Sequence, residues 1–110
     1  MPQSRLPPHN EEAEQSILGA LLIDKDAIIA VAEFLRPEHF YKDAHGKIYQ
    51  AMISLYEERE PIDLITLVGK LKKQGDYKMS GGNEYLTELV DRVPTSTNVE
   101  YYARIVEEHS

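Results

Sequence analysis

The chain contains no cysteine and no tryptophan among its 110 residues. Without cysteine it cannot form disulfides, bind zinc through thiolates or use a thiol in catalysis. It has no apolar run near the roughly 20 residues that a membrane-spanning helix needs. Residues 1–8 also lack an apolar core that could serve as a signal peptide. We therefore expect a cytoplasmic protein that does not enter a membrane.

Basic side chains are scarce, with 12 lysines and arginines against 19 aspartates and glutamates, for a formal net charge of −7. Such a surface repels the phosphate backbone of nucleic acids, so we expect no direct DNA binding and a basic or apolar protein partner instead. The only local basic cluster comprises Lys70, Lys72, Lys73 and Lys78. Because it lacks the interleaved aromatic residues of a single-strand binder, we interpret it as a solvated helix face.

Patterns of β-structure are absent as well. No segment alternates polar and apolar residues over a strand's length, and there is no Asn-Gly or Asp-Gly hairpin turn. Apolar residues instead recur at helical spacing, so we predict an all-α fold, a compact bundle of about six helices. The expected organisation is a flexible arm over residues 1–8, a globular helical domain over 9–96 and a final helix over 97–110. The helices are predicted at about residues 10–23, 27–35, 42–58, 64–74, 83–93 and 97–110.

The first predicted helix has the densest apolar patch, and we expect the domain to pack around it. Asn10 is placed to cap the helix, and Glu11, Glu12 and Glu14 follow where the helix dipole favours negative charge. Gly19-Ala20 predicts the close approach of a neighbouring helix. The apolar stripe consists of Ala13, Ile17, Leu18, Leu21 and Leu22.

The last predicted helix begins with the capping box Thr97-Asn98-Val99-Glu100. Two apolar stripes run along it: one formed by Val99, Tyr102, Ala103 and Val106, and another by Tyr101 and Ile105 on nearly the opposite side. A surface helix needs only one stripe, so the second predicts burial against something outside the domain. Because no stop residue follows Glu107, we expect the helix to continue into a longer protein.

No residue pattern predicts catalysis, a cofactor or a metal site in this chain. The pairs Gly46-Lys47 and Gly69-Lys70 lack both the first glycine and the hydroxyl residue of a phosphate-binding loop. No nucleophile stands beside a base in a known pattern. The four histidines, which we interpret as surface or half-buried residues, are too scattered for a metal pair: His9, His39, His45 and His109.

Six sequence blocks carry a signal that no single motif gives. They lie at residues 12–20, 39–49, 61–67, 81–86, 93–95 and 98–106. Taken in order and spacing, they closely resemble the N-terminal domain of the bacterial replicative DNA helicase, the DnaB type. The resemblance extends from about residue 8 to residue 108, so that only the first seven residues fall outside it.

The resemblance implies a hexameric ring that unwinds DNA at the replication fork by ATP hydrolysis. ATP and magnesium would bind a C-terminal motor domain that this chain lacks. The N-terminal domains would pair through a helical hairpin, which begins in residues 97–110, into a collar of three dimers. That collar would dock the C-terminal helicase-binding domain of primase, and a helicase loader could share the surface.

Candidate binding residues follow from this resemblance. We place primase docking on Glu11 and Glu12, at the start of the first helix, and around Tyr85, and we assign Tyr101 and Ile105 to self-association or hairpin packing. Two alternatives stay open at this point, the helicase-binding domain of primase itself and a generic helical dimerisation module. The start at Met1 with a proline-rich arm favours the helicase, because the primase module is C-terminal.

Overall fold

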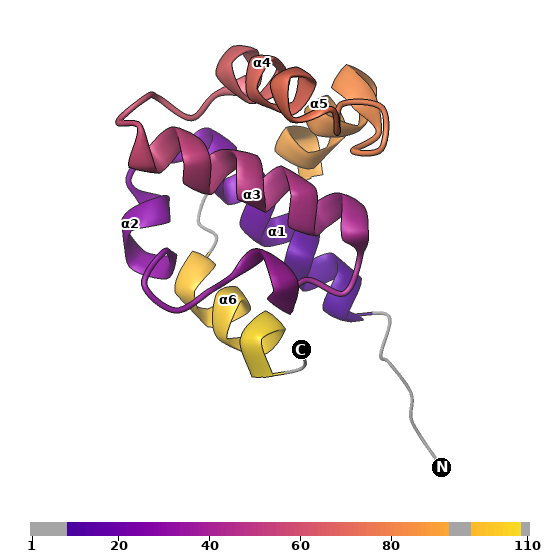
Figure 1. Ribbon diagram of the computed structural model, residues 1–110. Coiled ribbons are helices and arrows are strands. Elements are labelled where there is room, and N and C mark those ends of the chain that lie inside the picture. The colour runs from indigo at the N-terminus through magenta and orange to yellow at the C-terminus, as the bar shows by residue number, and fades with distance from the viewer. Residues whose placement is uncertain (1–8, 93–97, 109–110) are drawn as a thin grey trace.

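A computed structural model describes residues 9–92 and 98–108, and over these residues the fold is entirely helical, as predicted. The prediction of an arm over residues 1–8 and the capping hydroxyl of Thr97 lie outside the described residues. Figure 1 shows the order of the elements along the chain. They are α1 (His9–Ile23), α2 (Ala27–Val31), the 3-10 helix η1 (Pro37–His39), α3 (Asp43–Glu57), α4 (Leu64–Gln74), α5 (Gly82–Arg92) and α6 (Val99–Glu108).

Helix α1 lies at the centre of the fold and packs most closely against α5 and α6. Most of its predicted apolar stripe is buried, and Gly19 and Ala20 are buried too. The predicted cap is wrong, however, because the helix already begins at His9 and Asn10 therefore falls inside its first turn. The central position of α1 agrees with the dense apolar patch that the sequence shows there.

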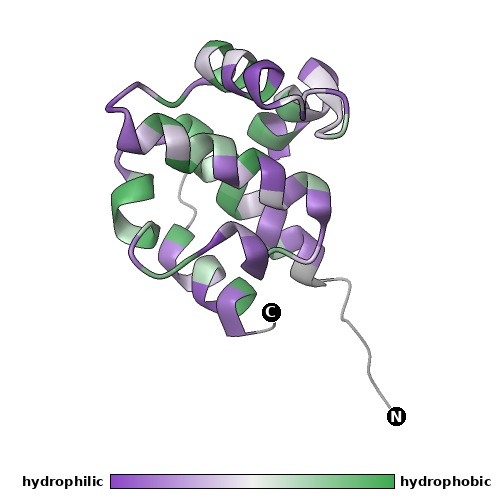
Figure 2. Cartoon of the chain, in the orientation of Figure 1, coloured by the Kyte–Doolittle hydropathy of each residue, from purple (hydrophilic) through white to green (hydrophobic). Residues whose placement is uncertain are grey.

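The segment after α1 is less regular than predicted. The α-helix that we expected over residues 27–35 ends at Val31 and continues as turns, in which the N–H groups of Phe34 and Leu35 both donate to the Val31 carbonyl. Figure 2 shows α2 as an almost uniformly hydrophobic segment. We expected no element over residues 38–41, but Pro37–His39 forms one turn of 3-10 helix, since the fixed φ of proline suits the start of a helical turn.

Helix α4 begins and ends where the sequence indicates. The Asp63 carboxylate accepts a hydrogen bond of 2.9 Å from the Thr66 N–H, and the Thr66 hydroxyl accepts one of 3.0 Å from the Asp63 N–H. At the other end Gly75 adopts φ 81°, the left-handed conformation that closes a helix at little cost for glycine. These two ends fix the length of α4.

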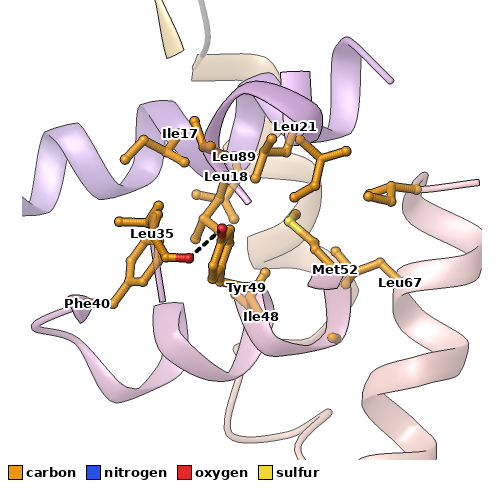
Figure 3. Packing of buried hydrophobic residues seen from close by; sticks show 14 of the residues in the cluster. Ile17, Leu18, Leu21, Leu35, Phe40, Ile48, Tyr49, Met52, Leu67 and Leu89 are labelled. Carbon is orange, nitrogen blue, oxygen red and sulfur yellow. Dashed lines mark hydrogen bonds between the residues drawn. The ribbon is translucent and has the colours of Figure 1, made fainter. Parts of the chain in front are cut away.

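The hydrophobic core lies between α1, α3 and the helices that cover them (Figure 3). Tyr49, at its centre, is fully buried, and its hydroxyl donates a hydrogen bond of 3.0 Å to the Leu35 carbonyl. Burial raises the pKa of the Tyr49 hydroxyl above its ordinary value, so the donor stays protonated. This bond ties α3 to the irregular segment that follows α2.

Helix α6 packs against α1 and α2. Ala103 and Val106 are buried, as their stripe predicts, and the Asn98 side chain caps the helix by accepting a hydrogen bond of 3.1 Å from the Tyr101 N–H. The Arg104 guanidinium stacks 3.7 Å from the centre of the Phe34 ring. The described part of α6 is thus joined to the globular body.

Candidate partner-binding groove

An open groove of about 520 Å³ lies between α1 and α6. Its walls combine aromatic and aliphatic surface with a few polar groups. The lining residues are Glu12, Ala13, Gln15 and Ser16 of α1, Arg92 at the end of α5, and Tyr101, Tyr102 and Ile105 of α6.

The α6 wall of the groove is aromatic and accessible. Tyr101 is 60% exposed, and its ring meets that of Tyr102 edge to face with 5.5 Å between centroids. Ile105, which the sequence assigned to the same outer stripe, is half-buried and also touches the core. Tyrosine presents a large amphipathic surface at a low cost in conformational entropy, which suits a protein contact.

Behind the groove lies a buried polar network formed by Glu14, His45 and Tyr85. Glu14 is 2% exposed and His45 is fully buried. The His45 ring places Nδ1 2.7 Å from Glu14 Oε1 and Nε2 2.6 Å from the Tyr85 hydroxyl. The two rings are also nearly parallel, with centroids 5.9 Å apart. The network thus joins α1, α3 and α5 through polar groups inside the fold.

One proton arrangement satisfies every member of this network. In this arrangement the imidazole donates from Nδ1 to Glu14, the Tyr85 hydroxyl donates to Nε2, and that hydroxyl accepts a bond of 3.2 Å from the Gln15 amide. Glu14 Oε2 also accepts a bond of 2.6 Å from the Tyr41 N–H. Because buried polar groups are costly only when unpaired, the network is compatible with a stable core.

Gln15 connects the buried network to the groove. Its amide nitrogen donates to Tyr85, and its carbonyl oxygen accepts a bond of 3.3 Å from the Arg92 guanidinium. Arg92 also pairs with Glu88 at 3.2 Å. Gln15 thus bridges Arg92 at the groove and the Tyr85 hydroxyl of the network.

The five candidate residues from the sequence fall into three places. Glu12, Tyr101 and Ile105 line the same groove, although we assigned them to two different roles. Tyr85 lies behind that groove, one hydrogen bond away through Gln15. Glu11 does not line it.

Glu11 instead forms an ion pair of 3.1 Å with Lys42, which precedes α3. The hydrogen bond from Lys42 to Glu11 raises the pKa of Lys42 above its ordinary value. Both side chains are about half exposed, at 47% and 49%, so the pair contributes little to stability. Of the two carboxylates Glu11 and Glu12, only that of Glu12 therefore lines the groove.

Sequence reasoning missed Glu14, His45, Gln15 and Arg92. Glu14 was interpreted only as a charge favourable to the helix dipole, and its burial was not predicted. The interpretation of His45 as a surface or half-buried residue is wrong, because His45 is fully buried. A signal was present: Glu14 precedes Ile17 and Leu18 by three and four positions, and His45 stands in the same relation to Ile48 and Tyr49. Two polar residues that both fall on buried stripes are expected to be hydrogen-bonded, and each is a candidate partner for the other.

Changing Tyr85 to phenylalanine is expected to lower the free energy of unfolding by about 1–3 kcal/mol, because His45 Nε2 and the Gln15 amide both lose their partner. Urea unfolding of both proteins measures the difference. Tyr77→Phe, whose hydroxyl accepts only an exposed backbone N–H, is the control and should cost less.

Two other kinds of site are absent from the described part of the chain. Residues 9–92 and 98–108 contain no group of three histidine, aspartate or glutamate side chains that could hold a metal ion. Within the same residues no helix is long and apolar enough to cross a membrane.

The helical arrangement defines a known class of domain. It resembles the crystal structure of the N-terminal domain of DnaB helicase from Mycobacterium tuberculosis, with a TM-score of 0.88 and 45% sequence identity over 94% of this chain and 74% of that one. Residues 6–108 match the family model of the DnaB-like helicase N-terminal domain. The chain belongs to this family.

Relatives among characterised proteins agree with the family assignment. The chain is 49% identical over 96% of its length to the replicative DNA helicase DnaB of Geobacillus stearothermophilus, and 45% identical over 94% to that of Mycobacterium leprae. It spans 23% and 17% of the length of these relatives. The family assignment decides against the rival interpretation as the helicase-binding domain of primase.

Proposed function

We propose that this chain is the N-terminal collar domain of a hexameric, ATP-dependent replicative DNA helicase, and that it pairs subunits and docks primase. The observation that supports this proposal most is the groove between α1 and α6. Glu12, Tyr101 and Ile105 line this groove, and the domain belongs to the DnaB-like helicase N-terminal family. The relatives' names describe replicative DNA helicases, which supports the activity of the whole protein.

The chain contributes binding surface to this activity, and the motor chemistry is assigned elsewhere. Its length is less than a quarter of that of the relatives, so we place ATP, magnesium and the hexameric motor in the remainder of the parent protein, and we expect no ATPase activity from this chain. With a net charge of −7, the domain is proposed to contact proteins and not DNA. A replicative helicase acts on the chromosome of a bacterium, which supports a cytoplasmic location.

The chemistry of the groove favours a partner with a basic and an aromatic or aliphatic group. Glu12 is exposed and supplies a negative charge at the α1 wall, while Tyr101 and Ile105 supply surface for apolar side chains. The same groove holds Glu12, which we assigned to primase docking, and Tyr101 and Ile105, which we assigned to self-association or hairpin packing. A generic dimerisation module would use the same groove without binding primase.

Charge reversal at Glu12, as Glu12→Lys, is expected to weaken binding of the C-terminal domain of primase by about tenfold, because a like charge then faces the basic group of the partner. Tyr101→Ala should weaken it to a similar extent through lost contact area. Isothermal titration calorimetry gives both affinities. Neither change should alter thermal unfolding by more than a few degrees, since both side chains are exposed.

Two matched variants control for these effects. Glu57→Lys reverses an exposed charge at the end of α3, and Tyr41→Ala removes a tyrosine that is 70% exposed outside the groove. If all four variants weaken primase binding equally, the groove is not the docking site. If none of them does, primase docks on another surface.

A further inference from the structure

A second groove, of about 460 Å³, lies between α4 and α5. In Figure 1 these two helices lie at the end of the molecule opposite to α6, so the groove is separate from the one between α1 and α6. Its apolar floor is unusual for a surface, because Ile65 is 85% exposed and Leu64 and Val68 are only half-buried. The lining residues are Leu64, Ile65, Val68, Lys72, Tyr77, Asn83 and Thr87.

The charge of this groove is opposite to that of the chain. Its lining holds one lysine and no carboxylate, although the chain as a whole carries −7. Lys72 is exposed at the groove, with Nζ 5.0 Å from the centre of the Tyr77 ring, and its neighbour Lys73 is exposed as well. Lys70, in contrast, is already paired with Glu58 at 2.7 Å. Lys72 is therefore the charged side chain that the groove presents to a partner.

We propose that this groove docks an acidic amphipathic helix of a protein partner. The apolar residues of that helix would cover Ile65 and Val68, and its carboxylates would approach Lys72. The 11 residues of α4 provide a wall of about 16 Å, which corresponds to three turns of a docked helix. This contact is independent of the proposed docking of primase on the other groove.

A single-stranded nucleic acid fits the groove less well than an acidic helix. Binding of that kind requires aromatic faces on which bases can stack. The only aromatic lining residue is Tyr77, whose ring already carries the Lys72 ammonium and whose hydroxyl accepts a bond of 3.0 Å from the Asn83 N–H. Three of the six other lining residues are aliphatic and offer nothing to a phosphate.

Three synthetic helical peptides test the proposal by NMR titration of the isotope-labelled chain. All three carry the same leucine stripe over about three turns, and the flanking positions are glutamate, glutamine or lysine. We expect the acidic peptide to shift the amide resonances of Ile65, Val68 and Thr87 and to bind at least about fivefold more tightly than the lysine peptide. A single-stranded oligothymidylate is titrated in parallel.

Variants assign the binding to the groove. Ile65→Asp should weaken the acidic peptide about tenfold or more, whereas Ile29→Asp, which changes an isoleucine that is 55% exposed on α2, should not. The proposal fails if no peptide shifts these resonances or if the glutamate and lysine peptides bind equally. It also fails if the oligonucleotide shifts the same resonances more strongly, or if they shift with protein concentration alone, which would assign the groove to a second copy of this chain.

Discussion

His45→Leu is expected to lower the free energy of unfolding by about 2–4 kcal/mol, because two buried polar groups each lose a hydrogen-bond partner. The leucine fills much of the space but leaves the carboxylate of Glu14, which is 2% exposed, without the imidazole that lies 2.7 Å away. Tyr85 loses the acceptor of its hydroxyl proton at the same time. Urea unfolding followed by circular dichroism measures the difference from the unchanged chain.

The cause of this loss can be isolated with two further proteins. His39→Leu removes another histidine, whose Nδ1 accepts an exposed backbone N–H from Arg36 at 2.9 Å, and should cost about 1 kcal/mol. The double variant Glu14→Gln with His45→Leu removes the buried charge but keeps an acceptor for the Tyr41 N–H, and should recover part of the stability lost in His45→Leu. A cost below about 1 kcal/mol for His45→Leu alone would contradict the role of the network in stability.

Gly81→Ala is expected to destabilise the chain by about 3 kcal/mol. Gly81 has φ 98°, which a residue with a side chain rarely adopts, and a Cβ atom added there would lie only 2.6 Å from Tyr85 Cβ. Tyr85 is the residue through which α5 joins the polar network. The added methyl group should therefore also displace the Tyr85 hydroxyl from His45.

Gly75→Ala separates the two causes. Gly75 also has a positive φ, of 81°, but a Cβ atom at this position would meet nothing within 4 Å. We therefore expect this variant to show only the backbone cost, about 1 kcal/mol. Equal losses in the two variants, measured by thermal unfolding, would show that the contact with Tyr85 does not matter.

Sequence periodicity predicted a helix well where the apolar pattern and the capping residues at its ends indicate the same boundaries. For α4, Asp63 and Gly75 mark both ends, and the apolar residues between them define one face. Prediction failed at α2, where an apolar run continues past Val31 but the backbone leaves the α-helix before Pro37. Leu35 and Phe40 are both buried in the core beyond this point, and periodicity carries no information about how the chain reaches them.

The candidate site was harder to predict than the fold because it depends on contacts between distant residues. The bond from Gln15 to Tyr85 spans 70 residues, and that from Arg92 to Gln15 spans 77. A single sequence gives no indication of such pairs. Family resemblance selected Glu12, whereas a second apolar stripe singled out Tyr101 and Ile105. The packing of α6 on α1 brings the three residues to one groove.

Sedimentation velocity of this chain, alone and mixed with the C-terminal helicase-binding domain of primase, tests most directly whether the domain docks primase. We expect the chain alone to sediment as a monomer or a weak dimer, and to form a faster-sedimenting complex on mixing. The experiment should be repeated with a longer chain that includes the segment after residue 110, where we place the rest of the pairing hairpin. A complex that is lost in Glu12→Lys and kept in Glu57→Lys would support docking on the groove between α1 and α6. If neither the short nor the long chain shifts on mixing, the proposed docking of primase is wrong.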